Sequence, residues 1–145
     1  MQRNLIWTLL CHSYGVEPQR NIIGGELEIC SLEPLTGFYR DGYAHTGPED
    51  LGSHTVCTVV NVEFLEHQKS VGNDLSTPML EYGFPGLRPG DRWAVCAPRW
   101  QQAIDDGVAS DVVLSATNEA AALFVSVEAL IANSVDVPSD PRSLL

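Results

Sequence analysis

Ammonium groups are nearly absent from this sequence. Only one of its eight basic residues is a lysine, Lys69, whereas 19 residues are aspartate or glutamate, and the formal net charge is −11. A charge of this sign repels both nucleic acids and anionic lipid surfaces. We therefore expect no nucleic-acid partner and no membrane partner. A halophilic source would account for the balance.

The sequence also lacks a hydrophobic run of the roughly 20 residues that a membrane span needs. The apolar run from Leu5 to Cys11 is short, and no small-residue cleavage site follows it, as a secretory signal would require. With 145 residues, of which 44% are hydrophobic, the chain can bury one core of ordinary size. These features favour a single soluble domain in the cytoplasm.

No C-x-x-C pair occurs among the four cysteines, Cys11, Cys30, Cys57 and Cys96, which excludes a zinc ribbon and a thioredoxin motif. A chain of this size with its own core does not need disulfides, so we expect reduced thiols. Glycine-rich phosphate-binding motifs are also missing. We expect no cofactor.

What the sequence does contain is a set of short elements separated by two long irregular stretches. Alternating or β-branched segments predict strands near 26–30, 54–60, 91–97 and 112–114. Capping residues and proline positions predict helices near 62–71, 98–106 and 127–132. This order predicts an α+β fold with a small, mostly antiparallel sheet.

The two irregular stretches, residues 31–53 and 73–90, are rich in glycine and proline and are too long to be simple connections. Their aromatic residues argue against disorder. We expect both loops to be ordered by burial of five rings, those of Phe38, Tyr39, Tyr82, Phe84 and Trp93.

Four segments in and around these stretches carry a specific resemblance: PLTGFYRDG (34–42), TGPEDLGSHTVC (46–57), GNDLSTP (72–78) and YGFPGLRPGDRW (82–93). They resemble the bacterial and plant family catalogued as domain of unknown function 2237, over roughly residues 21–136. Cys30, the HTVC segment and Cys96 match the pattern of that family. The resemblance implies one domain over 21–136 and an extension over 1–20, and Pro138 and Pro141 predict a frayed tail over 137–145. The resemblance implies no activity.

A reactive thiol is one hypothesis for the function. Histidine near a cysteine can activate the sulfur, and His54 precedes Cys57 by three positions. Residues three apart on a strand point to opposite faces, so this pair meets only if the strand bends. Cys57 and Cys96 fit buried core positions, whereas Cys30 lies at the start of a loop. The enzyme hypothesis is thus thiol or metal-assisted chemistry around Cys30, His54 and Cys57.

Metal binding would draw on the same region, but no spacing enforces a site, and we expect no metal. The available ligands are Cys30, His45, His54, Asp41, Glu49 and Asp50.

The hypothesis that we favour from the sequence is a binding domain for an unknown small molecule or protein, with a cleft between loops 31–53 and 73–90. The residues expected there combine polar groups with an aromatic wall: Arg40, Asp41, His54, Cys57, Asn73, Asp74, Arg92 and Trp93. Asp41, Asn73 and Asp74 could instead serve the turns in which they lie.

Overall fold

The computed structural model describes residues 18–136, so most of the predicted extension over 1–20 and the whole predicted tail lie outside the described residues. The described part is an α+β domain, as the sequence predicts. Three antiparallel strands lie in the order β2-β1-β3, formed by β1 (His54–Val59), β2 (Arg92–Cys96) and β3 (Asp111–Val112). The helices are α2 (Val62–Ser70), α3 (Ala97–Asp105) and α4 (Val127–Ala132), with short 3₁₀ turns η1 (Leu80–Tyr82), η2 (Leu114–Ala116) and η3 (Glu119–Leu123).

The helices begin where the capping residues predict. Asn61 accepts a hydrogen bond from the backbone N–H of Phe64 at 2.7 Å, and Ser126 accepts one from Ala129 at 3.1 Å. Helix α3 has Pro98 in its first turn, but its capping residue, Cys96, makes no side-chain capping bond. Within residues 18–136 no helix has the length and apolar character needed to cross a bilayer.

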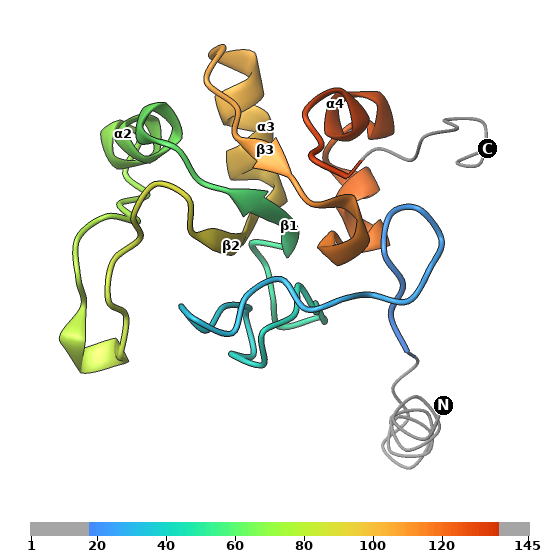
Figure 1. Cartoon of the computed structure of the whole chain (residues 1–145), viewed down its shortest axis with the longest axis horizontal. Helices are drawn as coiled ribbons and strands as arrows, with labels where there is room; N and C mark the ends of the chain where they lie inside the picture. The colour runs from blue at the N-terminus through green and yellow to red at the C-terminus, as the bar shows by residue number, and fades with distance from the viewer. Residues whose placement is uncertain (1–17, 137–145) are drawn as a thin grey trace.

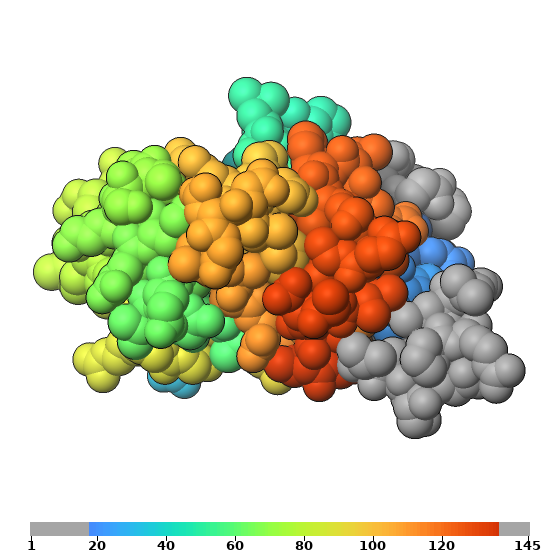
Figure 2. Space-filling view, turned by 90° about the horizontal axis from the view of Figure 1, so that it is seen from above, coloured from blue at the N-terminus to red at the C-terminus, as the bar shows by residue number. Residues whose placement is uncertain are grey.

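The core lies between the sheet and the helices, which gather on one side of it (Figure 1). Viewed from that side, α2, α3 and α4 lie next to one another and cover the strands (Figure 2). Val56 and Val95 are paired across β1 and β2, and both pack into this core with Phe64 and Trp100. Trp100 is fully buried, and its indole N–H donates to the carbonyl of Ser110 at 3.2 Å.

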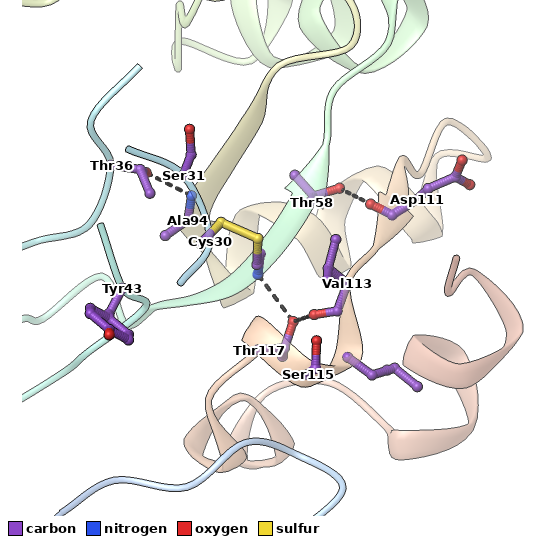
Figure 3. Close-up of a disulfide and its surroundings, with 12 residues drawn as sticks. Cys30, Ser31, Thr36, Tyr43, Thr58, Ala94, Asp111, Val113, Ser115 and Thr117 are labelled. Carbon is purple, nitrogen blue, oxygen red and sulfur yellow. Dashed lines mark hydrogen bonds between the residues drawn. A yellow bond between two sulfur atoms is a disulfide. The ribbon is translucent and has the colours of Figure 1, made fainter. Parts of the chain in front are cut away.

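Loop 31–53 covers the opposite face of the sheet, which carries Cys57 and Ala94 (Figure 3). Thr36 of the loop accepts a hydrogen bond from the backbone N–H of Ala94 at 2.8 Å. Cys30 and Cys57 form a disulfide across a separation of 27 residues. The expectation of reduced thiols is wrong for these two cysteines, because the start of the loop is bonded directly to β1.

The strand predicted at 26–30 does not form. Its amides pair with different segments, Glu28 with the carbonyl of Ser115 and Cys30 with that of Gly42, so no ladder to one neighbour develops. Leu27 and Cys30 are buried while Ile29 is 36% exposed, which breaks the alternation expected of a strand. The segment follows the surface of the domain without joining the sheet.

Aromatic burial holds the loops only in part: Phe84 of loop 73–90 packs on the core beside Trp93, but three of the five predicted rings are exposed. Trp93 is buried, but Tyr82 is 74% exposed, and Tyr39 and Phe38 are 43% and 38% exposed. Loop 31–53 is fixed by polar contacts and the disulfide instead. Its residue Ala44, for example, accepts a hydrogen bond from the buried side chain of Asn118 at 3.0 Å.

Candidate functional site

The candidate site lies where β1 begins and β2 ends. The two strands pair His54 with Cys96 and Val56 with Val95, and the register shifts between these pairs, so Thr55 is an extra residue on β1. Such a β-bulge re-aims the side chain beside it. It brings the ring of His54 against the sulfur of Cys96, at 3.3 Å from Nε2.

Asp50 holds the other side of the imidazole ring. Its Oδ1 lies 2.6 Å from Nδ1 of His54, while its Oδ2 accepts hydrogen bonds from the backbone N–H of His54 at 2.9 Å and from the hydroxyl of Thr46 at 3.0 Å. The side chain of Asp50 is completely buried. Because both oxygens of the Asp50 carboxylate can only accept hydrogen bonds, Nδ1 of His54 is the donor in this pair. The other ring nitrogen, Nε2, faces the sulfur of Cys96.

Asp50, His54 and Cys96 form a row of hydrogen-bonded side chains, and the contacts within this row shift the pKa values of Asp50 and His54. The hydrogen bond with Cys96 raises the pKa of His54 to about 9; burial acts in the opposite direction, and the bond to Asp50 adds to the increase. Burial alone would raise the pKa of Asp50, but hydrogen bonds from the ring and backbone of His54 and from Thr46 lower it below its usual range. At neutral pH the row therefore holds the carboxylate of Asp50 and the protonated ring of His54, with the sulfur of Cys96 beside the ring.

The row is partly open to solvent. The side chain of His54 is 33% exposed and Cys96 is half-buried, whereas Asp50 is covered. A Cβ on Gly52 would lie 3.0 Å from the sulfur of Cys96 and 3.2 Å from Cε1 of His54. Glycine at this position lets the turn pack closely against both reactive groups, because any larger residue would crowd them.

The thiol chemistry predicted around Cys30, His54 and Cys57 is wrong in its choice of sulfurs. Cys30 and Cys57 are oxidised and buried in the disulfide, and His54 contacts Cys96 instead. Among residues 18–136, no three His, Cys, Asp or Glu side chains could hold a metal ion together. Asp50 and Cys96 contact opposite nitrogens of the His54 ring, so they do not converge on one point.

The two loops meet at Trp93. The guanidinium of Arg40 lies 5.1 Å from the centroid of the Trp93 ring, and the ring of Phe84 lies 5.3 Å from it. Arg92 is exposed at the start of β2. Arg40 of one loop and Phe84 of the other therefore both contact Trp93 of β2.

Three other residues of the predicted cleft bond within their own segments. Asp41 pairs with His45 at 2.7 Å. Asn73 donates to the side chain of Gln68 at 2.8 Å, and Asp74 accepts bonds from Ser76 and Thr77 at the next turn. These are the local turn roles that the sequence left as the alternative.

Cys96 and Asp50 are the members of the row that the sequence analysis did not assign to a thiol site. Two signals mark them. Asp50 precedes His54 by four residues, and Cys96 stands between a strand and Ala97-Pro98, where a helix begins. A cysteine at a helix N-terminus is held in the positive end of the helix dipole.

Together, the fold and the row define a small α+β domain with a cysteine, a histidine and an aspartate in line at one end of its sheet. The family model described as an uncharacterized protein conserved in bacteria, domain of unknown function 2237, matches residues 20–134. The chain belongs to this family. No curated protein matches it.

Proposed function

We propose that this protein is an enzyme in which Cys96 is the nucleophile of a covalent mechanism. The observation that carries the proposal is the contact of Nε2 of His54 with the Cys96 sulfur at 3.3 Å, on a ring whose Nδ1 is held by Asp50 at 2.6 Å. Nucleophile, base and orienting carboxylate in this order are the parts that covalent thiol catalysis requires.

Each member of the row has one task. His54 accepts the proton of the Cys96 thiol at Nε2 and later returns it to the leaving group. Asp50 keeps Nδ1 protonated and supports the positive charge of the ring. The N-terminus of α3, which follows Cys96 directly, adds a favourable field for the thiolate.

The rate of alkylation by iodoacetamide tests this assignment, because only the thiolate reacts. In a Cys11→Ser background without reductant, Cys96 is the remaining free cysteine, since Cys30 and Cys57 are in the disulfide. We expect His54→Gln to slow alkylation at pH 6 by roughly ten- to a hundredfold, as expected when a cation beside the sulfur is lost. Asp50→Asn should slow it less.

His67→Gln is the matched control. His67 forms a bond of 2.7 Å to Asp106, but its other nitrogen faces Gln68 rather than a cysteine. Its removal should leave the alkylation rate unchanged. Equal rates in wild type and His54→Gln would exclude Cys96 as an activated nucleophile.

A second candidate function is binding without chemistry at the cleft between loops 31–53 and 73–90. The contacts of Arg40 and Phe84 with Trp93 favour it, because they combine a cation with an aromatic wall where the two loops meet. Its ligand would engage Arg40, Arg92 and Trp93 more than the locally bonded Asp41, Asn73 and Asp74. A metabolite screen by thermal shift, repeated on Arg40→Ala, tests it: a stabilising ligand should lose its effect in the variant.

A further inference from the structure

The turn in front of the thiol carries one free backbone donor. The amides of Asp50, Leu51 and Ser53 donate to carbonyls within the turn at 3.0–3.1 Å. The N–H of Gly52 donates to no acceptor among residues 18–136. Gly52 itself is partly exposed.

Gly52 lies directly beside the nucleophile. A Cβ on Gly52 would lie 3.0 Å from the Cys96 sulfur, and the amide nitrogen is bonded to the same Cα. A carbonyl group whose carbon approaches the sulfur beside Gly52 could therefore place its oxygen near the N–H of this residue. Backbone N–H groups in such positions stabilise the negative oxygen that forms when a nucleophile adds to a carbonyl.

Two exposed apolar side chains lie near His54 and Gly52. The Phe38 ring lies 5.7 Å from the His54 ring and is 38% exposed, and Leu51, which precedes Gly52, is 91% exposed. Exposed apolar residues next to a reactive group favour an apolar group on the substrate.

We infer that the reaction at Cys96 is acyl transfer from an ester or thioester with an apolar acyl chain, and that Gly52 supplies the N–H for its oxyanion. This inference rests on the proposed nucleophile. The thiolate adds to the carbonyl carbon, and the π electrons move to the oxygen opposite Gly52. The intermediate collapses to an acyl-Cys96 thioester, and the leaving group takes the proton from Nε2 of His54. Water, deprotonated by His54, then adds to the thioester carbonyl. The C–S bond breaks, which releases the acid and leaves the Cys96 thiolate beside protonated His54.

Two substitutions at Gly52 distinguish the effect of losing its N–H from the effect of adding a side chain. Gly52→Ala and Gly52→Pro both add a Cβ near the sulfur, but only proline removes the N–H. Acylation is followed in the Cys11→Ser chain with p-nitrophenyl hexanoate, as release of p-nitrophenolate and as the mass of acyl-Cys96. Alkylation by iodoacetamide, which forms no oxyanion at a carbonyl, is measured beside it.

We expect Gly52→Pro to acylate about a hundredfold more slowly than Gly52→Ala, in line with the loss of one oxyanion donor, while the two variants are alkylated at similar rates. Equal acylation of both variants would overturn the role of Gly52. Phe38→Ala should reduce the preference for the hexanoate over the acetate ester, and an unchanged preference would overturn the apolar acyl chain.

If Gly52→Pro does not fold, a protection experiment on the wild-type protein tests the acyl-transfer assignment instead. Hexanal adds to a thiolate to give a tetrahedral oxyanion, so it should protect Cys96 from iodoacetamide, whereas hexanol should not. Absence of protection would contradict the acyl-transfer assignment. If alkylation still depends on His54 in that case, the assignment of Cys96 as nucleophile stands and only the acyl-transfer assignment fails. If alkylation does not depend on His54, both assignments fail.

Discussion

At the scale of single residues, His54 links the chemistry of the site to the stability of the domain. Its pKa of about 9 in the folded protein lies above the ordinary value of 6.5. Folding therefore favours the protonated ring. The stabilisation is complete below about pH 6.5 and is lost as the pH rises through 9.

We expect the difference in urea midpoint between wild type and His54→Gln to shrink as the pH is raised from 6.5 to 9.5. Cys96→Ala removes the main cause of the elevated pKa and should reduce this pH dependence. Chemical denaturation of the three proteins at four or five pH values measures it. A difference between wild type and His54→Gln that stays constant over this range would contradict the protonated ring.

Asn118 is a second residue whose removal should affect stability, because its buried side chain joins separate segments of the chain by hydrogen bonds. Its side chain donates to the carbonyl of Ala44 at 3.0 Å and to the side chain of Gln19 at 2.6 Å, and it accepts from the amide of Ala120 at 2.9 Å. Removing a buried partner leaves such groups unsatisfied, at a cost of about 1–3 kcal/mol for each. Asn118→Ala should therefore lower the free energy of unfolding by roughly 2–4 kcal/mol in a urea titration. A loss below about 0.5 kcal/mol, as at an ordinary surface position, would contradict this role.

At the scale of elements, the turn from Asp50 to Ser53 links the part of the row formed by Asp50 and His54 to the part formed by Cys96. Ser53 has φ of 50°, a left-handed conformation that is uncommon without glycine. Its carbonyl accepts hydrogen bonds from Thr55 at 2.8 Å and from Ala97 at 2.9 Å, so one peptide group ties the start of β1 to the start of α3. The geometry between His54 and Cys96 depends on this backbone.

Ser53→Val should destabilise the domain by about 1–2 kcal/mol, because a β-branched residue fits the left-handed region poorly. Ser53→Gly, which adopts this conformation easily, should come within about 0.5 kcal/mol of wild type. Thermal unfolding measures both. If the valine variant also alkylates Cys96 more slowly at pH 6 while the glycine variant does not, the turn positions the thiol.

The disulfide plays the corresponding part for loop 31–53. It closes a segment of 27 residues, and cross-links of this size stabilise a folded chain by about 3 kcal/mol. We expect Cys30→Ala/Cys57→Ala to lose about this amount and to exchange amide hydrogens faster in residues 31–53 than in α3. Protection that stays equal in the two regions would show that the loop is held without the disulfide.

The elements with local signals are those that the sequence predicts well. The capping residues Asn61 and Ser126 fix the starts of α2 and α4. A β-branched run marks β1, and alternation of polar and apolar residues marks β2. The disulfide and the row of Asp50, His54 and Cys96 depend on which strands are paired and on the bulge between them. Residues 42 positions apart meet only through that pairing, so spacing along the chain could not reveal the contact of His54 with Cys96.

At the scale of the whole molecule, the net charge of −11 is the feature that no local contact explains. Among residues 18–136, the close contacts between a basic and an acidic side chain all involve a histidine, namely His45, His54 and His67. Arginine and lysine form none in this part of the chain. The excess carboxylates therefore repel one another with little compensation.

Salt should for this reason stabilise the protein. Counterions screen repulsion between exposed charges over a Debye length that falls from about 10 Å at 0.1 M to about 3 Å at 1 M. We expect the urea midpoint to rise between 0.05 M and 1 M potassium chloride, and Glu→Gln substitutions at exposed positions such as Glu63 and Glu66 to reduce the increase. Sodium sulfate, which also strengthens apolar burial, serves as a control for effects other than screening. A midpoint that does not change in potassium chloride would mean that the repulsion is too weak to matter, and the halophilic interpretation of the composition would then lose its physical basis.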